Sequence, residues 1–246
     1  MKENIYSRNA VYETLRARRR QFIRLLIADN IQEKGRLHEI LELAGQAKVP
    51  VERVPRLKMD SIVPNHQGVI LEAGKYPYMD IRDIIENAHD KNEPLFVLVL
   101  DSLQDPQNFG TLLRTAEAVG AHGIVLPLAR TVDVTPAVVN ASSGASEHLL
   151  IAQSNLVQAI EIFKKNDAWV VGLDEDSHSQ TPDQVRLDGG LAVVVGSEGD
   201  GIRPLVKQKC DFMLRLPMRG KIDSLNASVA GSIVLYLASL AREKHS

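Results

Sequence analysis

The continuous apolar runs in the C-terminal two thirds of the chain restrict the fold more than any other feature. Strands with one solvated face alternate apolar and polar residues, whereas these runs do not, so both of their faces must be covered. Segments with helical apolar spacing lie between or after them. The runs are Leu95–Leu100, Gly123–Leu126, Trp169–Leu173 and Leu191–Val195, and the helical segments are Thr111–Val119, Pro136–Ser142, Leu156–Lys165 and Ser224–Arg242. This alternation predicts an α/β domain with a parallel sheet and helices on either side.

The N-terminal part of the chain predicts a second, smaller α/β unit. Its expected elements are a helix from Asn9, as the N-cap, to Arg20, strands at Phe22–Ala28, Val51–Val54 and Gly68–Ala73, a helix around Leu37–Ala44 and a helical turn at Lys58–Ile62. Pro77 disfavours continuation of the last strand, and Asp80 can cap a new helix. We therefore expect an N-terminal domain over residues 1–75, a linker and connecting helix over 76–93, and a larger domain over 94–246.

The net charge of −2 hides an uneven distribution of charge along the chain. Residues 1–75 carry 14 basic and 9 acidic side chains, while residues 76–246 carry 15 basic and 22 acidic ones. Much of the basic excess lies in one cluster, which comprises Arg16, Arg18, Arg19, Arg20 and Arg24. Such a cluster either binds a polyanion through its phosphates or forms the solvated end of a helix.

The sequence also excludes several classes of protein. The apolar runs are far shorter than the roughly 20 residues that span a bilayer, so no membrane insertion is expected. The first residues lack the apolar stretch of a secretory signal, and a single cysteine, Cys210, can form neither an internal disulfide nor a zinc ribbon. We therefore expect a cytoplasmic protein.

The loops that follow the apolar runs are where a ligand site is expected, because open α/β sheets bind ligands at the carboxyl ends of their strands. The first loop, Asp101–Gly110, leads into a helix that carries Arg114. The second, Gly196–Gly201, directly follows an apolar run, and the third, Leu216–Asn226, joins the last strand to the last helix. Each loop by itself could equally be a tight connection, since Asp, Asn, Pro and Gly are common turn formers.

The second loop does not match the usual phosphate-binding patterns. Its glycines do not fit G-x-G-x-x-G, no Lys-Ser or Lys-Thr follows, and Glu198 would repel a phosphate. A glycine-rich loop with a carboxylate suits a cationic or hydroxyl-bearing ligand better, and its backbone groups can bind an adenine or a ribose. The chain also lacks the H-E-x-x-H metal motif and the G-x-S-x-G nucleophile motif, so we expect its isolated histidines to be structural or exposed.

Taken in order, the three loops resemble the three motifs of the SpoU branch of RNA ribose 2′-O-methyltransferases, in the SPOUT class. The motifs are Asp105-Pro106-Gln107-Asn108-Phe109-Gly110 with Arg114, then Gly196-Ser197-Glu198-Gly199-Asp200-Gly201, then Leu216-Pro217-Met218 through Ser224-Leu225-Asn226-Ala227-Ser228. The resemblance covers residues 94–243, and Ile202 and Ala227 are small apolar departures from it. Residues 5–73 are similar to the substrate-binding domain, related to ribosomal protein L30e, that often precedes this catalytic domain; the match is carried by Ser7–Val11 and His66–Val69.

The resemblance implies a fold, a cofactor and a set of site residues. The expected fold is a knotted parallel-sheet SPOUT methyltransferase domain, with a deep trefoil knot, preceded by a small L30e-like α/β domain. S-adenosylmethionine would bind among the knot loops, held by the backbone around Gly196, Leu216 and Leu225, and no metal is required. The implied catalytic residues are Arg114, Asn108, Glu198, Ser224 and Asn226, and the candidates for RNA binding are Arg16, Arg18, Arg19 and Arg20.

The resemblance allows two alternative catalytic roles for Arg114. It either accepts the proton of the attacked hydroxyl as a base or stabilises the developing alkoxide as a fixed cation. The second role is chemically easier, because a guanidinium stays protonated in nearly all proteins. The sequence leaves both open.

The implied activity is transfer of a methyl group from S-adenosylmethionine to a ribose 2′-hydroxyl in RNA. A guanosine of 23S rRNA is the expected target, because an extra N-terminal domain is more typical of the ribosomal members than of the minimal transfer-RNA ones. The alternatives are a tRNA substrate and a non-catalytic RNA-binding protein, and the joint presence of all five catalytic candidates argues against the latter. We expect a homodimer formed through the catalytic domain, because the resemblance implies that a partner covers the knot helices and because the last helix carries an apolar stripe. The stripe includes Val229, Ile233 and Leu237, which could instead simply cover the sheet.

Overall fold

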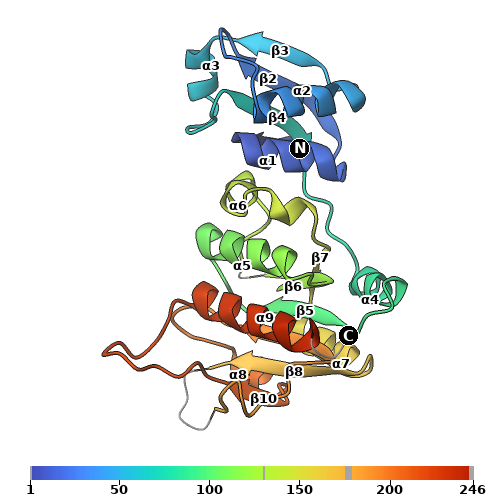
Figure 1. Ribbon diagram of the computed structural model, residues 1–246, viewed down its shortest axis with the longest axis vertical. Coiled ribbons are helices and arrows are strands. Elements are labelled where there is room, and N and C mark those ends of the chain that lie inside the picture. Colours follow the sequence, from blue (N-terminus) through green and yellow to red (C-terminus); the bar gives the residue numbers. More distant parts are fainter. Residues whose placement is uncertain (1, 130, 175–178, 244–246) are drawn as a thin grey trace. The chain divides into compact units, whose positions relative to one another are not determined.

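The computed structural model describes residues 2–129, 131–174 and 179–243 (Figure 1). This described part divides into two compact units. The first comprises Met1–Pro77 together with Asp133–His148, and the second comprises Tyr78–Val132 and Leu149–Ser246. The segment Asp133–His148, which lies within the domain predicted over residues 94–246, is therefore grouped with the N-terminal part of the chain. Among the described residues, no helix is both long and apolar enough to cross a membrane.

The first unit is built on a mixed sheet with the strand order β1-β4-β2-β3. Strands β2 and β3 run parallel, whereas β4 is antiparallel to both β1 and β2. Leu26, Met59 and Ile70 form part of its buried core. Its elements are β1 (Lys2–Tyr6), α1 (Arg8–Ala17), β2 (Phe22–Ala28), α2 (Arg36–Gln46), β3 (Val51–Val54), α3 (Arg56–Asp60) and β4 (Val69–Gly74), together with α6 (Pro136–Ala141) and the 3-10 turn η1 (Ala145–Glu147).

The first helix and the first strand differ from the sequence prediction. Helix α1 begins at Arg8 and has Ser7, with a φ of 72°, in its N-cap position, so the expected Asn9 cap is wrong. The helix ends at Ala17 and does not reach the predicted end, because Arg18 adopts the left-handed conformation and its N–H bonds back to a carbonyl of the last turn. Strand β1 was not predicted, since its pairing partner β4 lies almost seventy residues along the chain.

A buried ion pair holds the segment Asp133–His148 to the rest of the first unit. The Arg20 Nε and Nη2 atoms donate to the two carboxylate oxygens of Glu147, each at 2.9 Å, and both side chains are fully buried. The Arg20 Nη1 atom donates to the Glu3 carboxylate at 2.6 Å and to the carbonyl of Gly74 at 3.1 Å. Burial disfavours the charged guanidinium, but these carboxylates outweigh it and raise the pKa of Arg20. The guanidinium is therefore a structural cation of the first unit.

The second unit contains a parallel sheet with the strand order β10-β8-β9-β5-β6-β7. Helices α4, α7 and α8 cover one face, while α5 and α9 pack side by side on the other (Figure 1). The prediction of a parallel sheet buried on both faces is thereby confirmed. The elements are α4 (Ile81–Asp90), β5 (Phe96–Leu100), α5 (Pro106–Ala118), β6 (Gly123–Pro127), β7 (Ile151–Ser154), α7 (Leu156–Lys164), β8 (Ala168–Leu173), β9 (Gly190–Val195), α8 (Pro204–Lys207), β10 (Phe212–Leu214) and α9 (Ala227–Glu243).

Helix α9 starts at Ala227, three residues later than predicted, and its start is set by Asn226. The Oδ1 atom of Asn226 accepts hydrogen bonds from the backbone N–H groups of Ser228 at 2.9 Å and Val229 at 3.3 Å, which is the pattern of a helix N-cap. One turn further, Gly231 lets α9 approach α5 and β9 closely, because a Cβ atom there would lie 2.7 Å from a Leu112 methyl group. This cap and this close packing place the start of α9 beside the ends of the strands.

Candidate functional site

The first motif positions its asparagine through a capped helix start. The Asp105 carboxylate accepts hydrogen bonds from the backbone N–H groups of Gln107 and Asn108, both at 3.2 Å. Pro106 follows at the first helical position, where its missing N–H leaves no intrahelical bond unmade. Asn108 therefore lies in the first turn of α5, at the carboxyl end of the sheet.

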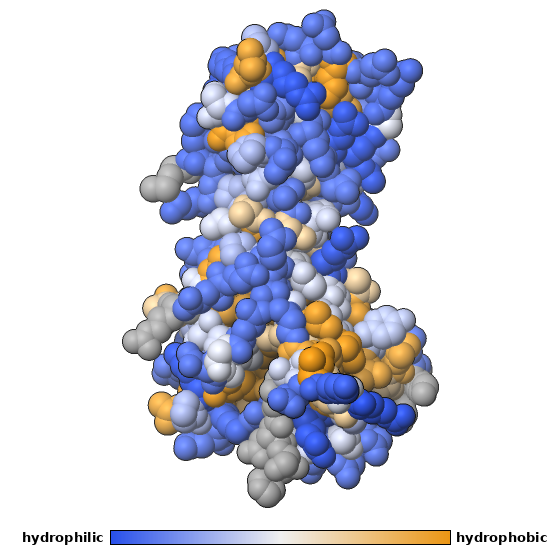
Figure 2. Space-filling model, turned by 90° about the vertical axis from the view of Figure 1, so that its left-hand side faces the viewer, coloured by the Kyte–Doolittle hydropathy of each residue, from blue (hydrophilic) through white to orange (hydrophobic). Residues whose placement is uncertain are grey.

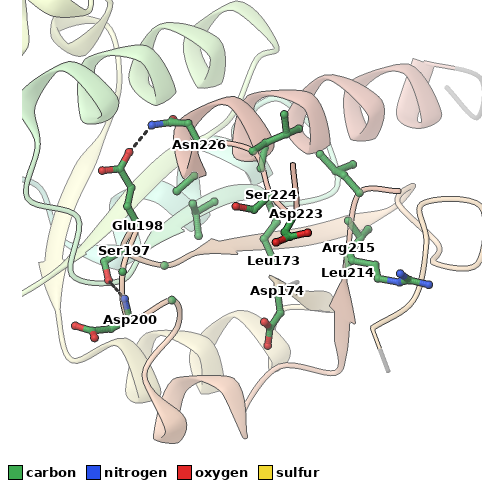
Figure 3. A pocket seen from close by; sticks show the side chains of 18 of the residues that line it. Leu173, Asp174, Ser197, Glu198, Asp200, Leu214, Arg215, Asp223, Ser224 and Asn226 are labelled. Carbon is green, nitrogen blue, oxygen red and sulfur yellow. Dashed lines mark hydrogen bonds between the residues drawn. The ribbon is translucent and has the colours of Figure 1, made fainter. Parts of the chain in front are cut away.

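Side chains from all three motifs meet at Glu198. Figure 3 shows its contact with Asn226 of the third motif. Its Oε1 atom accepts from Asn108 Nδ2 of the first motif at 2.6 Å and from Asn226 Nδ2 of the third. The Ser228 hydroxyl lies 3.0 Å from Asn108 Oδ1 and 2.6 Å from Asn226 Oδ1. Because each amide is held at both its nitrogen and its oxygen, the two asparagines have a defined orientation.

The second motif folds into a tight loop that only glycine allows at its entrance. Backbone hydrogen bonds of 3.1 Å join Ser197 and Gly201 in both directions. A Cβ atom on Gly196 would lie 2.1 Å from the Gly201 carbonyl carbon, a distance at which the backbone has to move. Gly201 itself has a φ of +63°, in the left-handed region that favours glycine. The loop therefore presents bare backbone at the end of β9.

A cavity of about 570 Å³ opens at the carboxyl ends of β8, β9 and β10, and Figure 3 shows its side chains converging on it. This volume is typical of sites for small-molecule ligands. The cavity is lined by residues of the second and third motifs and by the ends of the strands. They include Leu173, Asp174, Gly196, Glu198, Asp200, Leu214, Arg215, Leu216, Met218, Asp223, Ser224, Leu225 and Asn226.

Most of the predicted site residues lie in or beside this cavity. Gly196, Leu216 and Leu225, which were expected to hold the cofactor, all line it, as does Ser224. Glu198 and Asn226 line it as well, and Asn108 joins them through its hydrogen bond to Glu198. Arg114 is exposed on α5, outside the set of described residues that line the cavity.

The arginines expected to bind RNA have different environments. Arg16 and Arg18 are exposed at the end of α1. Arg19 is half-buried and donates to the Tyr76 hydroxyl at 3.1 Å. Arg20 is buried among its carboxylates, so the structure corrects its expected role, because a fully covered guanidinium cannot contact a phosphate at the surface.

Comparison with known proteins decides the family. The family described as "SpoU rRNA Methylase family" matches residues 95–236, and the domain described as "RNA 2'-O ribose methyltransferase substrate binding" matches residues 5–79. The chain belongs to the SpoU methyltransferase family. A Bacillus subtilis (strain 168) protein named as a TrmH family tRNA/rRNA methyltransferase, YacO, is 44% identical to this SpoU protein over 236 residues, which cover 94% of this chain and 93% of that one.

Solved structures share the fold of this SpoU methyltransferase across both units. The SpoU methyltransferase AviRb from Streptomyces viridochromogenes, in complex with the cofactor AdoMet, superposes with a TM-score of 0.81 at 20% identity, covering 99% of this chain and 91% of that one. An AdoMet-bound rRNA methyltransferase from Sinorhizobium meliloti gives 0.75 at 23% identity, covering 96% and 86%. The predictions of the family, of its α/β fold and of an RNA methyltransferase are confirmed. The trefoil knot stays a prediction.

Two further residues of the SpoU site were not singled out from the sequence. Ser228 orders both amides, although it was noted only as the end of the third motif. Asp174 lines the cavity and forms an ion pair with Lys207 of α8. Asp174 directly follows the apolar run that ends at Leu173, so the rule that ligands lie beyond strand ends could have found it.

Proposed function

We propose that this methyltransferase modifies a ribose 2′-hydroxyl in ribosomal RNA, with a guanosine of 23S rRNA as the target. The observation that carries this proposal is the meeting of Asn108, Glu198 and Asn226 at the rim of a cofactor-sized cavity. A protein that merely bound RNA would need neither the cavity nor the ordered amides beside it. A cytoplasmic location, as expected from the sequence, agrees with such a substrate.

The residues of the cavity fit S-adenosylmethionine, which we place there. The ligand carries a cationic sulfonium, and the described lining includes the carboxylates of Asp174, Glu198, Asp200 and Asp223 against the single guanidinium of Arg215. Attraction between the acidic lining and a cation favours binding. Leucine side chains from the strand ends and the third motif supply apolar surface suited to an adenine ring. The backbone around Gly196, Leu216 and Leu225 would hold the adenine and ribose.

When bound, S-adenosylmethionine supplies a methyl group activated on a sulfonium for transfer to a ribose 2′-oxygen. We assign the surrounding groups to orienting the RNA and handling the charge of its hydroxyl. Asn108 orients the ribose from the first turn of α5, and Glu198, Ser224 and Asn226 order the site. Arg114 stabilises negative charge on the 2′-oxygen as a fixed cation and holds the neighbouring phosphate, because its guanidinium keeps its proton.

We assign recognition of the RNA to the first unit, with the domains divided at residues 1–75, 76–93 and 94–246 and with Asp133–His148 joined structurally to the first. Support comes from the match to a substrate-binding domain and from the basic excess of residues 1–75. The Sinorhizobium meliloti protein, described as an rRNA methyltransferase, shares this two-unit fold. Arg16, Arg18 and Arg19 are the arginines of the cluster that we assign to phosphate contacts.

We also propose that the protein is a homodimer through its second unit. The apolar residues Val229, Ile233, Tyr236 and Leu240 recur at helical spacing along α9, and each is between 38% and 58% exposed. Tyr236 takes the exposed place that the sequence prediction gave to Leu237, which is half-buried. Apolar groups also interrupt the hydrophilic surface of the second unit on the face shown in Figure 2. A second copy would cover the α9 stripe. Sedimentation at micromolar concentration as a monomer would refute this assembly.

The function is tested by mapping ribose methylation across total RNA from cells with and without the protein. Loss of one 2′-O-methylguanosine from 23S rRNA is the expected result, whereas loss of a tRNA modification would transfer the proposal to the tRNA class. Calorimetry with S-adenosylmethionine tests the enzyme separately. A protein that failed to bind the cofactor would be an RNA-binding module, and the proposal would be wrong.

A further inference from the structure

A buried carboxylate lies behind the glycine loop, at the end of the central strand β5. Asp101 has no exposed surface and stands outside the described residues that line the cavity. Its Oδ1 accepts from Arg203 Nε at 2.6 Å, and its Oδ2 accepts from the Arg203 backbone N–H at 2.8 Å. The Ser102 hydroxyl lies 3.2 Å from Oδ1. The carboxylate thus accepts three hydrogen bonds, two of them from one residue that follows the second motif.

The same residue also binds the start of the second motif. The backbone N–H of Asp101 donates to the carbonyl of Val195 at 2.8 Å, immediately before the loop begins at Gly196. Its side chain holds Arg203, which is separated from the end of the loop at Gly201 only by Ile202. The loop entrance and exit are therefore both anchored on Asp101. The atoms between these anchors provide bare backbone to the cavity and carry Glu198.

We infer that Asp101 is a positioning residue for cofactor binding, which acts by clamping both ends of the glycine loop through Val195 and Arg203. The inference rests on the proposed placement of S-adenosylmethionine in the cavity. If the Asp101–Arg203 ion pair only stabilised the fold, its loss would lower the stability of the protein but leave the affinity of the folded protein for the cofactor unchanged. A clamp on the loop changes the affinity directly, because the loop backbone is part of the cavity wall.

The substitution Asp101→Asn separates these roles with little change in shape. The two Arg203 donors bond to different oxygens of Asp101, and asparagine replaces one of these oxygens with an NH2 group, so both bonds cannot be kept in their present geometry. At the Arg203 end of the clamp, one N–H donor then faces another donor. Arg203→Ala is a milder second variant, because it removes the guanidinium, whose side chain is 41% exposed, and keeps the backbone N–H bond.

Asp211 provides the matched control. Its carboxylate also accepts from a backbone N–H, that of Val170 at 2.9 Å, and from a cation, Lys164 Nζ at 2.6 Å. It directly precedes β10 and pairs with Val170 of β8, toward the amino ends of these strands, whereas the cavity opens at their carboxyl ends. Asp211→Asn therefore disrupts the same kind of contact without touching the loop.

The experiment measures the S-adenosylmethionine Kd of the full chain by calorimetry together with the melting temperature. We expect Asp101→Asn to raise the Kd about tenfold, equivalent to about 1.4 kcal/mol. Arg203→Ala is expected to raise it about threefold, as for loss of one modest hydrogen bond, and Asp211→Asn to leave it unchanged. At saturating cofactor the turnover of Asp101→Asn should recover, because Asn108 and Asn226 still hold Glu198.

A lower melting temperature with an unchanged Kd in Asp101→Asn would overturn the inference. If Asp101→Asn does not fold, the same criterion applies to Arg203→Ala: a lower melting temperature with an unchanged Kd would overturn the inference. Leu216→Arg, which places a long cationic side chain in the wall of the cavity, tests the placement of the cationic cofactor separately from the clamp. If Leu216→Arg abolishes cofactor binding while both clamp variants bind normally, the clamp is wrong and the cavity stands. If Leu216→Arg also binds normally, the placement of the cofactor is wrong and the clamp falls with it.

Discussion

Substitution of Glu147 by alanine tests how the segment Asp133–His148 is held in the first unit. Glu147 and Arg20 are both fully buried and share a two-pronged ion pair with donor–acceptor distances of 2.9 Å. Glu147→Ala leaves the guanidinium buried with the Glu3 carboxylate at 2.6 Å and the Gly74 carbonyl as remaining acceptors. We expect the variant to be less stable, because the buried positive charge of Arg20 is then only partly compensated by its remaining acceptors.

The magnitude follows from this partial compensation. Removing one partner of a buried ion pair costs about 3–5 kcal/mol. Because Glu3 remains and its side chain is 20% exposed, we expect the lower end, about 3 kcal/mol. In a domain of about 60–100 residues each kcal/mol lowers the melting temperature by about 4–8 °C. The first unit should therefore melt at least about 12 °C below the wild type.

Circular dichroism during thermal unfolding measures this effect, with Glu13→Ala as the control. Glu13 also contacts the same segment, through His148 at 2.7 Å, but both side chains are partly exposed, so its loss should cost less than about 1 kcal/mol. The double variant Arg20→Met with Glu147→Leu should recover most of the stability, because neither of the two fully buried positions then carries a charge and the remaining Glu3 carboxylate is partly exposed. Equal melting temperatures for Glu147→Ala and Glu13→Ala would refute the reasoning.

Three further predictions concern catalysis, pH and RNA binding. Arg114→Ala should reduce single-turnover methylation roughly 100-fold while cofactor binding by calorimetry stays unchanged, and Arg114→Lys should recover little; near-normal turnover would mean that the active site is misplaced. Burial lowers the pKa of His122. As the pH falls below 6.5, the unfolded chain therefore binds a proton at this histidine more readily than the folded protein does. The free energy of unfolding of the wild type should decrease in this pH range, and that of His122→Asn should decrease less. The paired substitution of Arg16 and Arg18 by alanine should weaken RNA binding and reduce the slope of log K against log salt by about 0.7–0.9 for each lost phosphate contact, and an unchanged slope in filter binding would exclude them.

Local patterns were sufficient to predict four of the six strands in the sheet of the second unit, β5, β6, β8 and β9, and the loops of its site, whereas the short strand β7 was not predicted. The apolar runs from Leu95 to Val195 predict buried parallel strands because a strand covered on both faces must be apolar on both, which is visible in a few consecutive residues. The three loops were likewise predictable, because ligand sites follow the ends of such strands. The capped start of α4 after Asp80 was predictable for the same local reason, since a cap binds N–H groups two or three residues away.

Contacts between distant segments were decided by the tertiary structure. Nothing near Arg20 in the sequence distinguishes it from Arg18, yet one guanidinium is exposed and the other is buried against a glutamate 127 residues away. That pairing is one of the contacts between Asp133–His148 and the rest of the first unit, together with the packing of α6 against β1 and of η1 against α1. Glu198 and Asp101 are similar cases, because their partners, Asn108 and Arg203, come from other segments of the chain, 90 and 102 residues distant. Hydrogen bonds and ion pairs act over a few ångströms in space, so their partners are set by the chain path, which local periodicity does not encode.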